Sequence, residues 1–179
     1  RLLSYHGAMA PSETVQQHRA AAAGSLSMGV ITVSDTRTFD DDTGGALIVD
    51  MLQNAGHTVE DRRIVIDNRE QIVNALLDMA GDPAIDAVIT TGGTGIARRD
   101  VTYDAVTSVL VRKIDGFGEL FRMLSWEEIG SAAMLSRATA GAIGSTVVFS
   151  IPGSRNAIQL AMEKLILPEI AHVVFEIRK

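Results

Sequence analysis

Residues 90–100 read TTGGTGIARRD and combine glycines, threonines and two arginines directly after an apolar run. Gly92, Gly93 and Gly95 allow positive φ angles and a close approach of the backbone to a ligand, because no Cβ atom stands in the way. Successive N–H groups in such a turn form a concave anion site, and a helix starting near Thr102 would add the positive end of its dipole. A tight turn that needs glycine only for its shape is the alternative, but three glycines among four residues, beside Thr and Arg, favour ligand binding.

Two common phosphate-binding motifs do not fit this segment. The P-loop requires Lys-Ser or Lys-Thr after its second glycine, whereas Ile96 and Ala97 follow Gly95. The dinucleotide fingerprint requires a third glycine where Arg98 stands. The chain is therefore neither an ordinary P-loop NTPase nor a Rossmann dehydrogenase.

Two carboxylates follow strands that could end at the same edge of a sheet. Asp67 comes after the strand expected at 58–66, and Asp100 ends the glycine-rich segment. Paired carboxylates beside phosphate groups are the usual ligands of Mg²⁺, which takes oxygen ligands and keeps several waters. In the alternative, Asp67 only starts a turn and Asp100 caps a helix over 101–110.

Other polar residues give weaker signals. The run Asp40–Asp42 is more typical of a solvated turn and a helix N-terminus than of a metal site. Ser136 and Arg137 form a pair that could bind phosphate, but the pair alone does not identify a site.

The elements that must position these residues alternate along the chain. Apolar, β-branched runs predict strands, and amphipathic stretches of about a dozen residues predict the helices between them. This order indicates an α/β fold, a single three-layer domain with a mostly parallel sheet flanked by helices. The strands are expected at 28–34, 58–66, 86–91, 138–143 and 146–151, and the main helices at 43–55, 68–80, 103–110, 117–124 and 154–167.

Three of the strands end in polar loops, at 34–37, 90–100 and 151–154. In parallel sheets ligands bind outside the carboxyl ends of the strands. If the sheet is parallel, the three loops open on the same edge, and this convergence predicts a single site.

Composition narrows the possible functions. We interpret residues 1–27 as a flexible extension and 28–179 as one domain, and 46% hydrophobic residues supply a full core. Aromatic residues make up only 4% of the chain and the net charge is −6, which argues against nucleic-acid binding.

The absence of cysteine excludes disulfides, thiolate zinc sites and thiol nucleophiles, and fits a cytoplasmic location. No apolar run approaches the roughly 18 residues of a membrane span, and the first 25 residues lack the apolar core of a signal peptide.

Several motifs together resemble the MoaB/MogA family of molybdenum cofactor biosynthesis, to which the gephyrin G domain also belongs. The segment 116–130, GFGELFRMLSWEEIG, is more similar to the MoaB branch than to the MogA branch. The other motifs are Ser34-Asp35, Asp41 with Thr43-Gly44, TTGGTGIARRDVT at 90–102, LSRATAG at 135–141 and IPGS at 151–154.

The resemblance implies a MogA-like fold assembled as homo-trimers, with hexamers in the MoaB branch, and molybdopterin as the ligand. It implies that active members adenylylate the terminal phosphate of molybdopterin with ATP and Mg²⁺. By position, Asp67 and Asp100 match the family's two functional acids, which we expect to be catalytic and to hold the metal. The substrate-binding residues expected from the motifs are Ser34, Asp35, Thr91, Gly92, Gly93, Thr94, Gly95, Arg99, Ser136, Arg137, Pro152, Gly153 and Ser154.

One position departs from the family pattern, because Tyr103 stands where the active branch usually has proline. Proline is pre-organised for the first helical turn, so the change could shift the helix start. Two functions stay open: a molybdopterin adenylyltransferase, which Asp67, Arg98, Arg99 and Asp100 favour, and a non-catalytic molybdopterin-binding or assembly protein.

The apolar segment 117–126 also has two interpretations. It could belong to the intramolecular core, or it could form the surface between copies of the chain that the resemblance implies.

Overall fold

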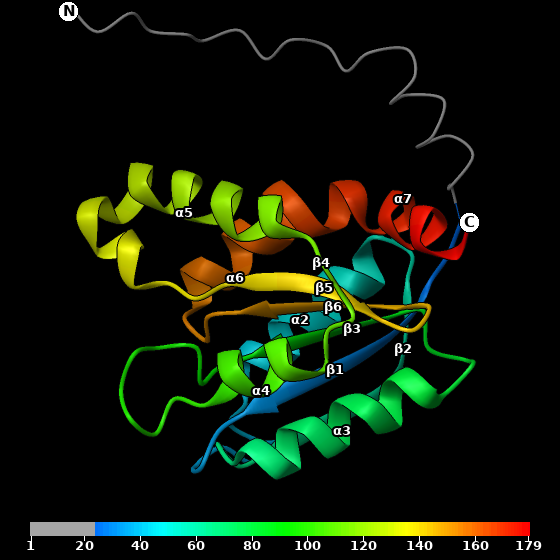
Figure 1. Ribbon diagram of the computed structural model, residues 1–179, viewed down its shortest axis with the longest axis horizontal. Coiled ribbons are helices and arrows are strands. Elements are labelled where there is room, and N and C mark those ends of the chain that lie inside the picture. The colour runs from blue at the N-terminus through cyan, green and yellow to red at the C-terminus, as the bar shows by residue number, and fades with distance from the viewer. Residues whose placement is uncertain (1–23) are drawn as a thin grey trace, which may run out of the picture.

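The computed structural model describes residues 24–179, so most of the extension expected at 1–27 lies outside the described part. Figure 1 shows a twisted sheet covered by helices on both faces. The strands are β1 (Ser27–Val33), β2 (Thr58–Val65), β3 (Ala87–Thr91), β4 (Arg112–Lys113), β5 (Thr139–Ile143) and β6 (Thr146–Ile151). The helices are α2 (Thr43–Asn54), α3 (Arg69–Gly81), α4 (Thr102–Val109), α5 (Asp115–Ile129), α6 (Arg155–Ala161) and α7 (Leu167–Arg178), with a 3-10 turn η1 (Gly130–Leu135) and a π-helical turn η2 (Met162–Ile166).

The sheet has the strand order β2-β1-β3-β6-β5-β4. The pairs β1–β2, β1–β3 and β3–β6 are parallel, whereas β5 runs antiparallel to β6 and to the short edge strand β4. The expected hairpin turns at Gly144, whose φ of 59° suits glycine. The α/β prediction with a mostly parallel sheet is confirmed, while β4 was not expected because two residues carry no periodicity.

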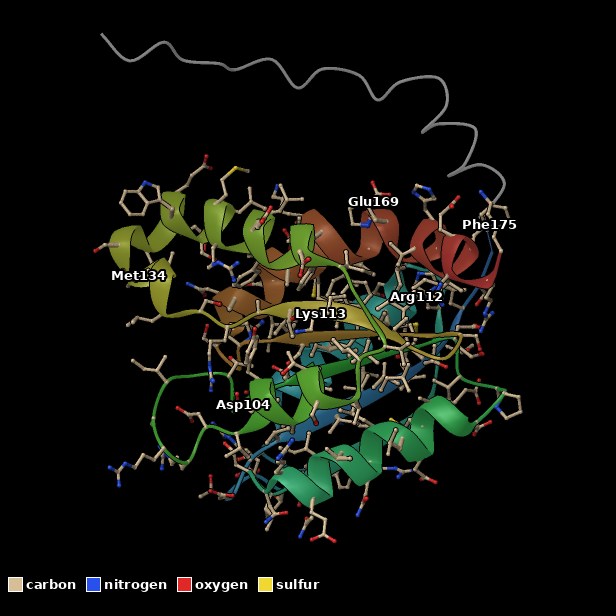
Figure 2. All side chains as sticks on the ribbon, in the orientation of Figure 1. Asp104, Arg112, Lys113, Met134, Glu169 and Phe175 are labelled. Carbon is tan, nitrogen blue, oxygen red and sulfur yellow. The ribbon has the colours of Figure 1, made fainter. Side chains whose placement is uncertain are left out.

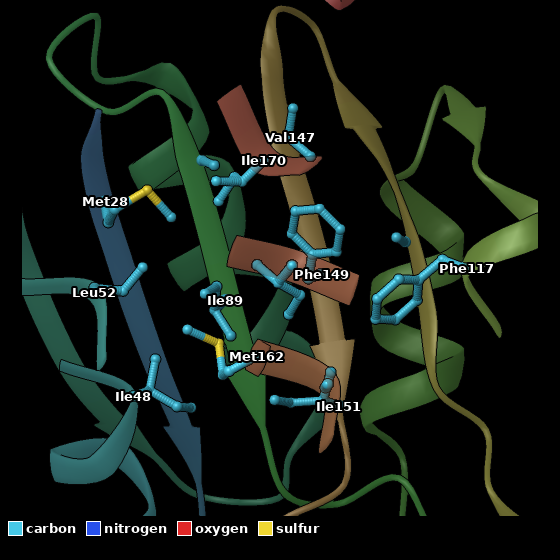
Figure 3. Packing of buried hydrophobic residues seen from close by; sticks show 14 of the residues in the cluster. Met28, Ile48, Leu52, Ile89, Phe117, Val147, Phe149, Ile151, Met162 and Ile170 are labelled. Carbon is cyan, nitrogen blue, oxygen red and sulfur yellow. The ribbon is translucent and has the colours of Figure 1, made fainter. Parts of the chain in front are cut away.

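Each face of the sheet buries its own cluster. Alternate residues of one strand point to opposite faces, so Ile89 packs with α2, α5, α6 and α7, whereas Val88 packs with α3 and α4. Figure 3 shows the first cluster, with Ile48 and Leu52 of α2 on one side and Phe149 of β6 on the other. Because helices pack on both faces of the sheet, a site is expected at the carboxyl ends of β1, β3 and β6.

The last predicted helix is divided. The stretch expected at 154–167 forms α6 followed by the π-helical turn η2, and Pro168 then lies in the first turn of α7. Proline has no N–H to give to the carbonyl four residues earlier, so the regular helical pattern is interrupted near this point. No helix within residues 24–179 is long and apolar enough to cross a membrane.

Candidate functional site

The ends of β3 and β6 are tied together at the carboxyl edge of the sheet. The N–H of Gly92 donates to the carbonyl of Ile151 at 3.2 Å, and the hydroxyl of Thr91 donates to the carbonyl of Pro152 at 3.2 Å. Gly153 packs so closely on Gly92 that an added Cβ atom would lie 3.3 Å from the Gly92 Cα. The predicted convergence of the strand-end loops is therefore confirmed.

Two glycines are required by the backbone itself. Gly92 has a φ of 98°, and a Cβ atom there would overlap the carbonyl oxygen of Val33 on β1. Gly93 has a φ of 61°, and a Cβ atom there would overlap the hydroxyl of Thr102. The interpretation as a tight turn that needs glycine for its shape is therefore confirmed for Gly92 and Gly93, and ligand binding by the same loop stays a prediction.

A cavity of about 350 Å³ lies against this loop. It has a polar wall of loop backbone and an apolar wall from α5, η1 and α6. Within residues 24–179, the N–H groups of Gly93, Thr94 and Gly95 donate to no acceptor, so three donors remain for an anion. The cavity is lined by Gly92, Gly93, Thr94, Gly95, Phe121, Ser125, Ile129, Leu135, Ser136, Pro152, Gly153, Ser154 and Ala157.

A second, smaller cavity of about 150 Å³ adjoins the first. Gly92 and Gly153 line both cavities, so the close contact between these glycines separates the two spaces. The other residues that line the smaller cavity are Thr32, Val33, Ser34, Arg37, Asp42, Thr43, Gly44 and Thr91. Of the expected substrate-binding residues, ten thus line one cavity or both, whereas Asp35, Arg99 and Arg137 line neither.

The expected acids lie over the glycine loop. Gly93 and Gly95 each leave room for one carboxylate, because an added Cβ atom would lie 2.7 Å from Asp67 Oδ2 and 2.5 Å from Asp100 Oδ2, respectively. The amide of Asp67 in turn donates to Asp35 Oδ1 at 2.9 Å. Three acids, from the loops that follow β1, β2 and β3, therefore gather beside one turn.

Helix α4 is capped from a distance. Asp67 Oδ1 accepts the N–H of Val101 at 3.2 Å, and no side chain of α4 itself caps the helix. Asp100 Oδ2 instead accepts the N–H of Ala97 at 2.9 Å inside the loop. The alternative in which Asp100 is the helix cap is therefore wrong, because Asp67 takes that role from the end of β2, which β1 separates from β3.

The charge on Asp67 is unfavourable in the absence of a cation. Burial raises the pKa of Asp67 above its usual value, and the nearby Asp100 and Asp35 raise it further. The N–H of Val101 and the guanidinium of Arg99 oppose this shift without cancelling it. A cation at this place would relieve both the burial and the repulsion.

The oxygen donors around Gly93 fit a hard cation. Asp67 Oδ2 and Thr102 Oγ1 both border the space where Gly93 lacks a side chain, and the buried Thr102 hydroxyl has no hydrogen-bond partner. Among residues 24–179, no group of three or more His, Cys, Asp or Glu is placed to hold a metal. Asp67 and Asp100 therefore suit Mg²⁺ only in company with ligand phosphates and water, which is the usual arrangement for that ion.

Arg137 is engaged with the protein. Its guanidinium donates to the carbonyls of Thr94, Gly95 and Asp100 and pairs with the Asp104 carboxylate at 3.1 Å. Ser136 lines the larger cavity, and Ser136 and Arg137 together line another cavity of about 290 Å³ beside Tyr103. Contact between Arg137 and the ligand therefore stays a prediction.

The run 40–42 was expected to be a solvated turn and a helix N-terminus. Asp40 and Asp41 are exposed and Asp42 is the N-cap of α2, as expected. Only the solvation of Asp42 is wrong, because its side chain is 3% exposed and accepts hydrogen bonds from Thr32, Gly45 and Arg62. Burial raises the pKa of Asp42, but the bonds from Arg62, Gly45 and Thr32 outweigh burial and hold the pKa below its usual value. The N-cap spacing to Gly45 was visible in the sequence, whereas the partner Arg62, twenty residues away, was not.

The apolar wall of the larger cavity was also missed. Phe121, Ile129 and Leu135 line it. The sequence assigned the segment 117–126, which contains Phe121, to the core or to an interface, and it gave Ile129 and Leu135 no binding role. Helical spacing identifies an apolar face but not which of its residues borders a cavity.

Comparisons with known proteins identify the family and the fold. A family model described as a probable molybdopterin binding domain matches residues 29–172. The chain is 52% identical over 167 residues to molybdenum cofactor biosynthesis protein B of Bacillus subtilis strain 168, covering 93% of this chain and 98% of that protein. A crystal structure of a molybdenum cofactor biosynthesis protein B superposes with a TM-score of 0.85 at 51% identity, over 87% of this chain and 97% of the other. The structure of the tungsten cofactor synthesizing protein MoaB from Pyrococcus furiosus gives a TM-score of 0.79 at 38% identity, over 88% and 99% of the two chains.

Proposed function

Because the chain belongs to the MogA/MoaB family of molybdenum cofactor biosynthesis proteins and carries its molybdopterin-binding domain, we propose that it adenylylates the phosphate of molybdopterin with Mg-ATP. The observation that carries the proposal is the meeting of free backbone N–H groups with two carboxylates at one turn. Gly93, Thr94 and Gly95 supply the donors, and Asp67 and Asp100 supply the carboxylates.

The two adjoining cavities suit a reaction between two substrates. The larger has the apolar wall and the polar edge that a pterin with a terminal phosphate requires. The smaller opens beside Arg37 and Ser34. Since Gly92 and Gly153 line both, ligands in the two spaces would meet at the glycine loop.

The residues present match the demands of adenylyl transfer. The reaction is an in-line attack by the molybdopterin phosphate on the α-phosphorus of ATP, with pyrophosphate as the leaving group. It depends on positioning and charge neutralisation rather than on a protein nucleophile. The loop amides would hold the attacking phosphate, and Asp67 and Asp100 would hold Mg²⁺. The metal would neutralise phosphate charge when bound.

The test is the reaction itself. Purified protein is given molybdopterin and ATP with and without Mg²⁺, and both pyrophosphate and adenylylated molybdopterin are measured. We expect Mg²⁺-dependent turnover that Asp100→Ala abolishes and that Asp50→Asn, an exposed acid on α2, leaves intact. Full activity of Asp100→Ala would contradict the role of Asp100. Binding of molybdopterin without turnover under any nucleotide or metal condition would establish the non-catalytic alternative.

We also propose that the protein acts as a homo-oligomer, a trimer or a hexamer. The outer face of α5 and η1 exposes large apolar side chains, and such contiguous surfaces mark interfaces. Figure 2 shows Met134 at the outer end of the segment formed by α5 and η1. The exposed members are Leu120, Met123, Trp126, Ile129, Met134 and Leu135, whereas Phe117 and Phe121 of the same helix are buried.

A further inference from the structure

The guanidinium of Arg137 contacts one side of the glycine loop at several points. Nε donates to the carbonyl of Thr94 at 3.3 Å, and Nη2 donates to the carbonyls of Gly95 and Asp100, the latter at 2.7 Å. Nη1 pairs with the Asp104 carboxylate, and the guanidinium carbon lies 5.1 Å from the centre of the Tyr103 ring. One side chain from the start of β5 thus holds both ends of the segment 94–100.

These contacts fix the direction of the loop N–H groups. In a trans peptide the C=O and the next N–H point in opposite directions. The carbonyls of Thr94 and Gly95 point to Arg137, so the N–H groups of Gly95 and Ile96 point away from it. The same rule is visible at Asp100, whose carbonyl faces Arg137 while the following N–H, on Val101, bonds to Asp67.

We propose that Arg137 is a positioning residue that holds the glycine loop as an anion receptor, with the carbonyls of Thr94 and Gly95 turned toward the arginine and the N–H groups of Gly95 and Ile96 turned away from it, toward the ligand. Tyr103 supports it through the contact between ring and guanidinium. At the position where the family pattern has proline, this chain therefore has an aromatic side chain that holds the arginine. The identity of the anion rests on the proposed function, whereas the effect on the loop does not.

The competing role is a direct one, in which Arg137 binds the ligand phosphate. The two roles differ in the ligand-free protein. If Arg137 positions the loop, replacing it makes the loop less ordered even in the ligand-free protein. If Arg137 only binds the ligand phosphate, replacing it leaves the ligand-free loop unchanged.

Amide hydrogen exchange on the ligand-free, full-length protein separates the two roles. In Arg137→Met we expect four N–H groups to exchange at least about tenfold faster: those of Ala97, Asp100 and Thr102, which are bonded within the loop, and that of Val101, which is bonded to Asp67. Amides of β1 and α3 should keep their wild-type rates, which shows that the fold is intact. Arg112→Met is the matched control, because Arg112 lies on the edge strand β4 and donates only to the exposed carbonyl of Gly144.

Conservative variants and rescue complete the test. Arg137→Lys should give intermediate rates, because an ammonium group cannot reach three carbonyls in one plane. Tyr103→Phe should behave as wild type and Tyr103→Ala should loosen the loop partly. Free guanidinium ion, added to Arg137→Ala at concentrations that leave the β1 amides protected, should restore slow exchange in the loop.

Binding of inorganic pyrophosphate is measured on the same proteins. Weakened binding that parallels faster loop exchange supports positioning. Loop exchange at the wild-type rate in Arg137→Met and in Arg137→Lys overturns the proposal, whether or not pyrophosphate binding falls. Failure of the wild type to bind molybdopterin would instead contradict the proposed function and leave the exchange result standing.

Discussion

The carboxylate of Asp67 accepts the N–H of Val101 at 3.2 Å, which joins the end of β2 to the start of α4 across the glycine loop. The bond gives α4 the N-terminal acceptor that its own side chains do not provide. It also holds a partly buried carboxylate beside Asp100 and Asp35. One side chain therefore serves the structure through one oxygen and remains available to a cation through the other.

Replacing Asp67 by Asn should stabilise the metal-free protein at neutral pH. The pKa of Asp67 is raised in the folded state, so its favourable contribution is complete below the unfolded pKa and is lost as pH rises through the folded pKa. Asn keeps the acceptor for Val101 and removes the charge. We expect a higher Tm than wild type at pH 7 and a difference that shrinks toward pH 3.

Added Mg²⁺ should raise the Tm of the wild type in the presence of pyrophosphate and leave that of Asp67→Asn nearly unchanged. Asp50→Asn, which removes an exposed carboxylate on α2, is the control and should respond as wild type. An equal response of Asp67→Asn and wild type to the metal would contradict the placement of Mg²⁺ at Asp67.

Breaking the pair between Arg62 and Asp42 should destabilise the fold strongly. The Asp42 carboxylate is almost fully buried, so Arg62→Met leaves a charge without its partner, and we expect a loss of roughly 3 kcal/mol in the free energy of unfolding at pH 7. The loss should decrease as the pH falls through the lowered pKa of Asp42 in the folded wild type, because protonation removes the charge that Arg62 pairs with. Urea unfolding at pH 7 and pH 3 measures both values.

The neighbouring Arg63 supplies the control on the same strand. Its partners Asp61 and Asp78 are 30% and 66% exposed, so Arg63→Met should lose less than about 1 kcal/mol. Similar losses for the two variants would show that burial of Asp42 is not the cause.

Replacing Gly92 and Gly56 by alanine distinguishes two losses of stability: the loss from an unfavourable backbone conformation and the loss from a steric clash. Both have positive φ, at 98° and 87°, but only Gly92 has an atom, the Val33 carbonyl oxygen, where a Cβ would go. Gly56→Ala should lose about 1 kcal/mol from conformation alone. Gly92→Ala should lose clearly more and should also lose molybdopterin binding, as measured by urea unfolding and by titration. Equal losses of stability would show that β1 yields to the added methyl group.

The sequence predicted the features that local patterns encode. The β-branched runs and amphipathic stretches gave the α/β order, and the order placed Gly92 and Pro152 at one edge of the sheet. Contacts between distant residues were not accessible in this way. Arg62 lies twenty residues from Asp42, and Arg137 lies 37 residues from Asp100, so no periodicity links either pair. The sequence shows the positive charge of Arg137 but not the carbonyls that its guanidinium contacts, so its hydrogen bonds to the glycine loop were not predicted.

The apolar face of α5 and η1 can be tested with the single tryptophan of the chain. Trp126 is 61% exposed in one copy, next to Met123 at 56%. If copies associate through this face, the indole leaves water, and its emission should shift to shorter wavelength as the protein concentration rises. Met123→Glu would bury a charge in the interface, so light scattering should report a smaller species whose emission stays at the wavelength of exposed indole.

Glu119→Gln, an exposed change on the same helix, should leave the assembly unchanged. A wild-type monomer at all concentrations would contradict the proposed oligomer, and an oligomer with fully exposed Trp126 would place the interface on another face.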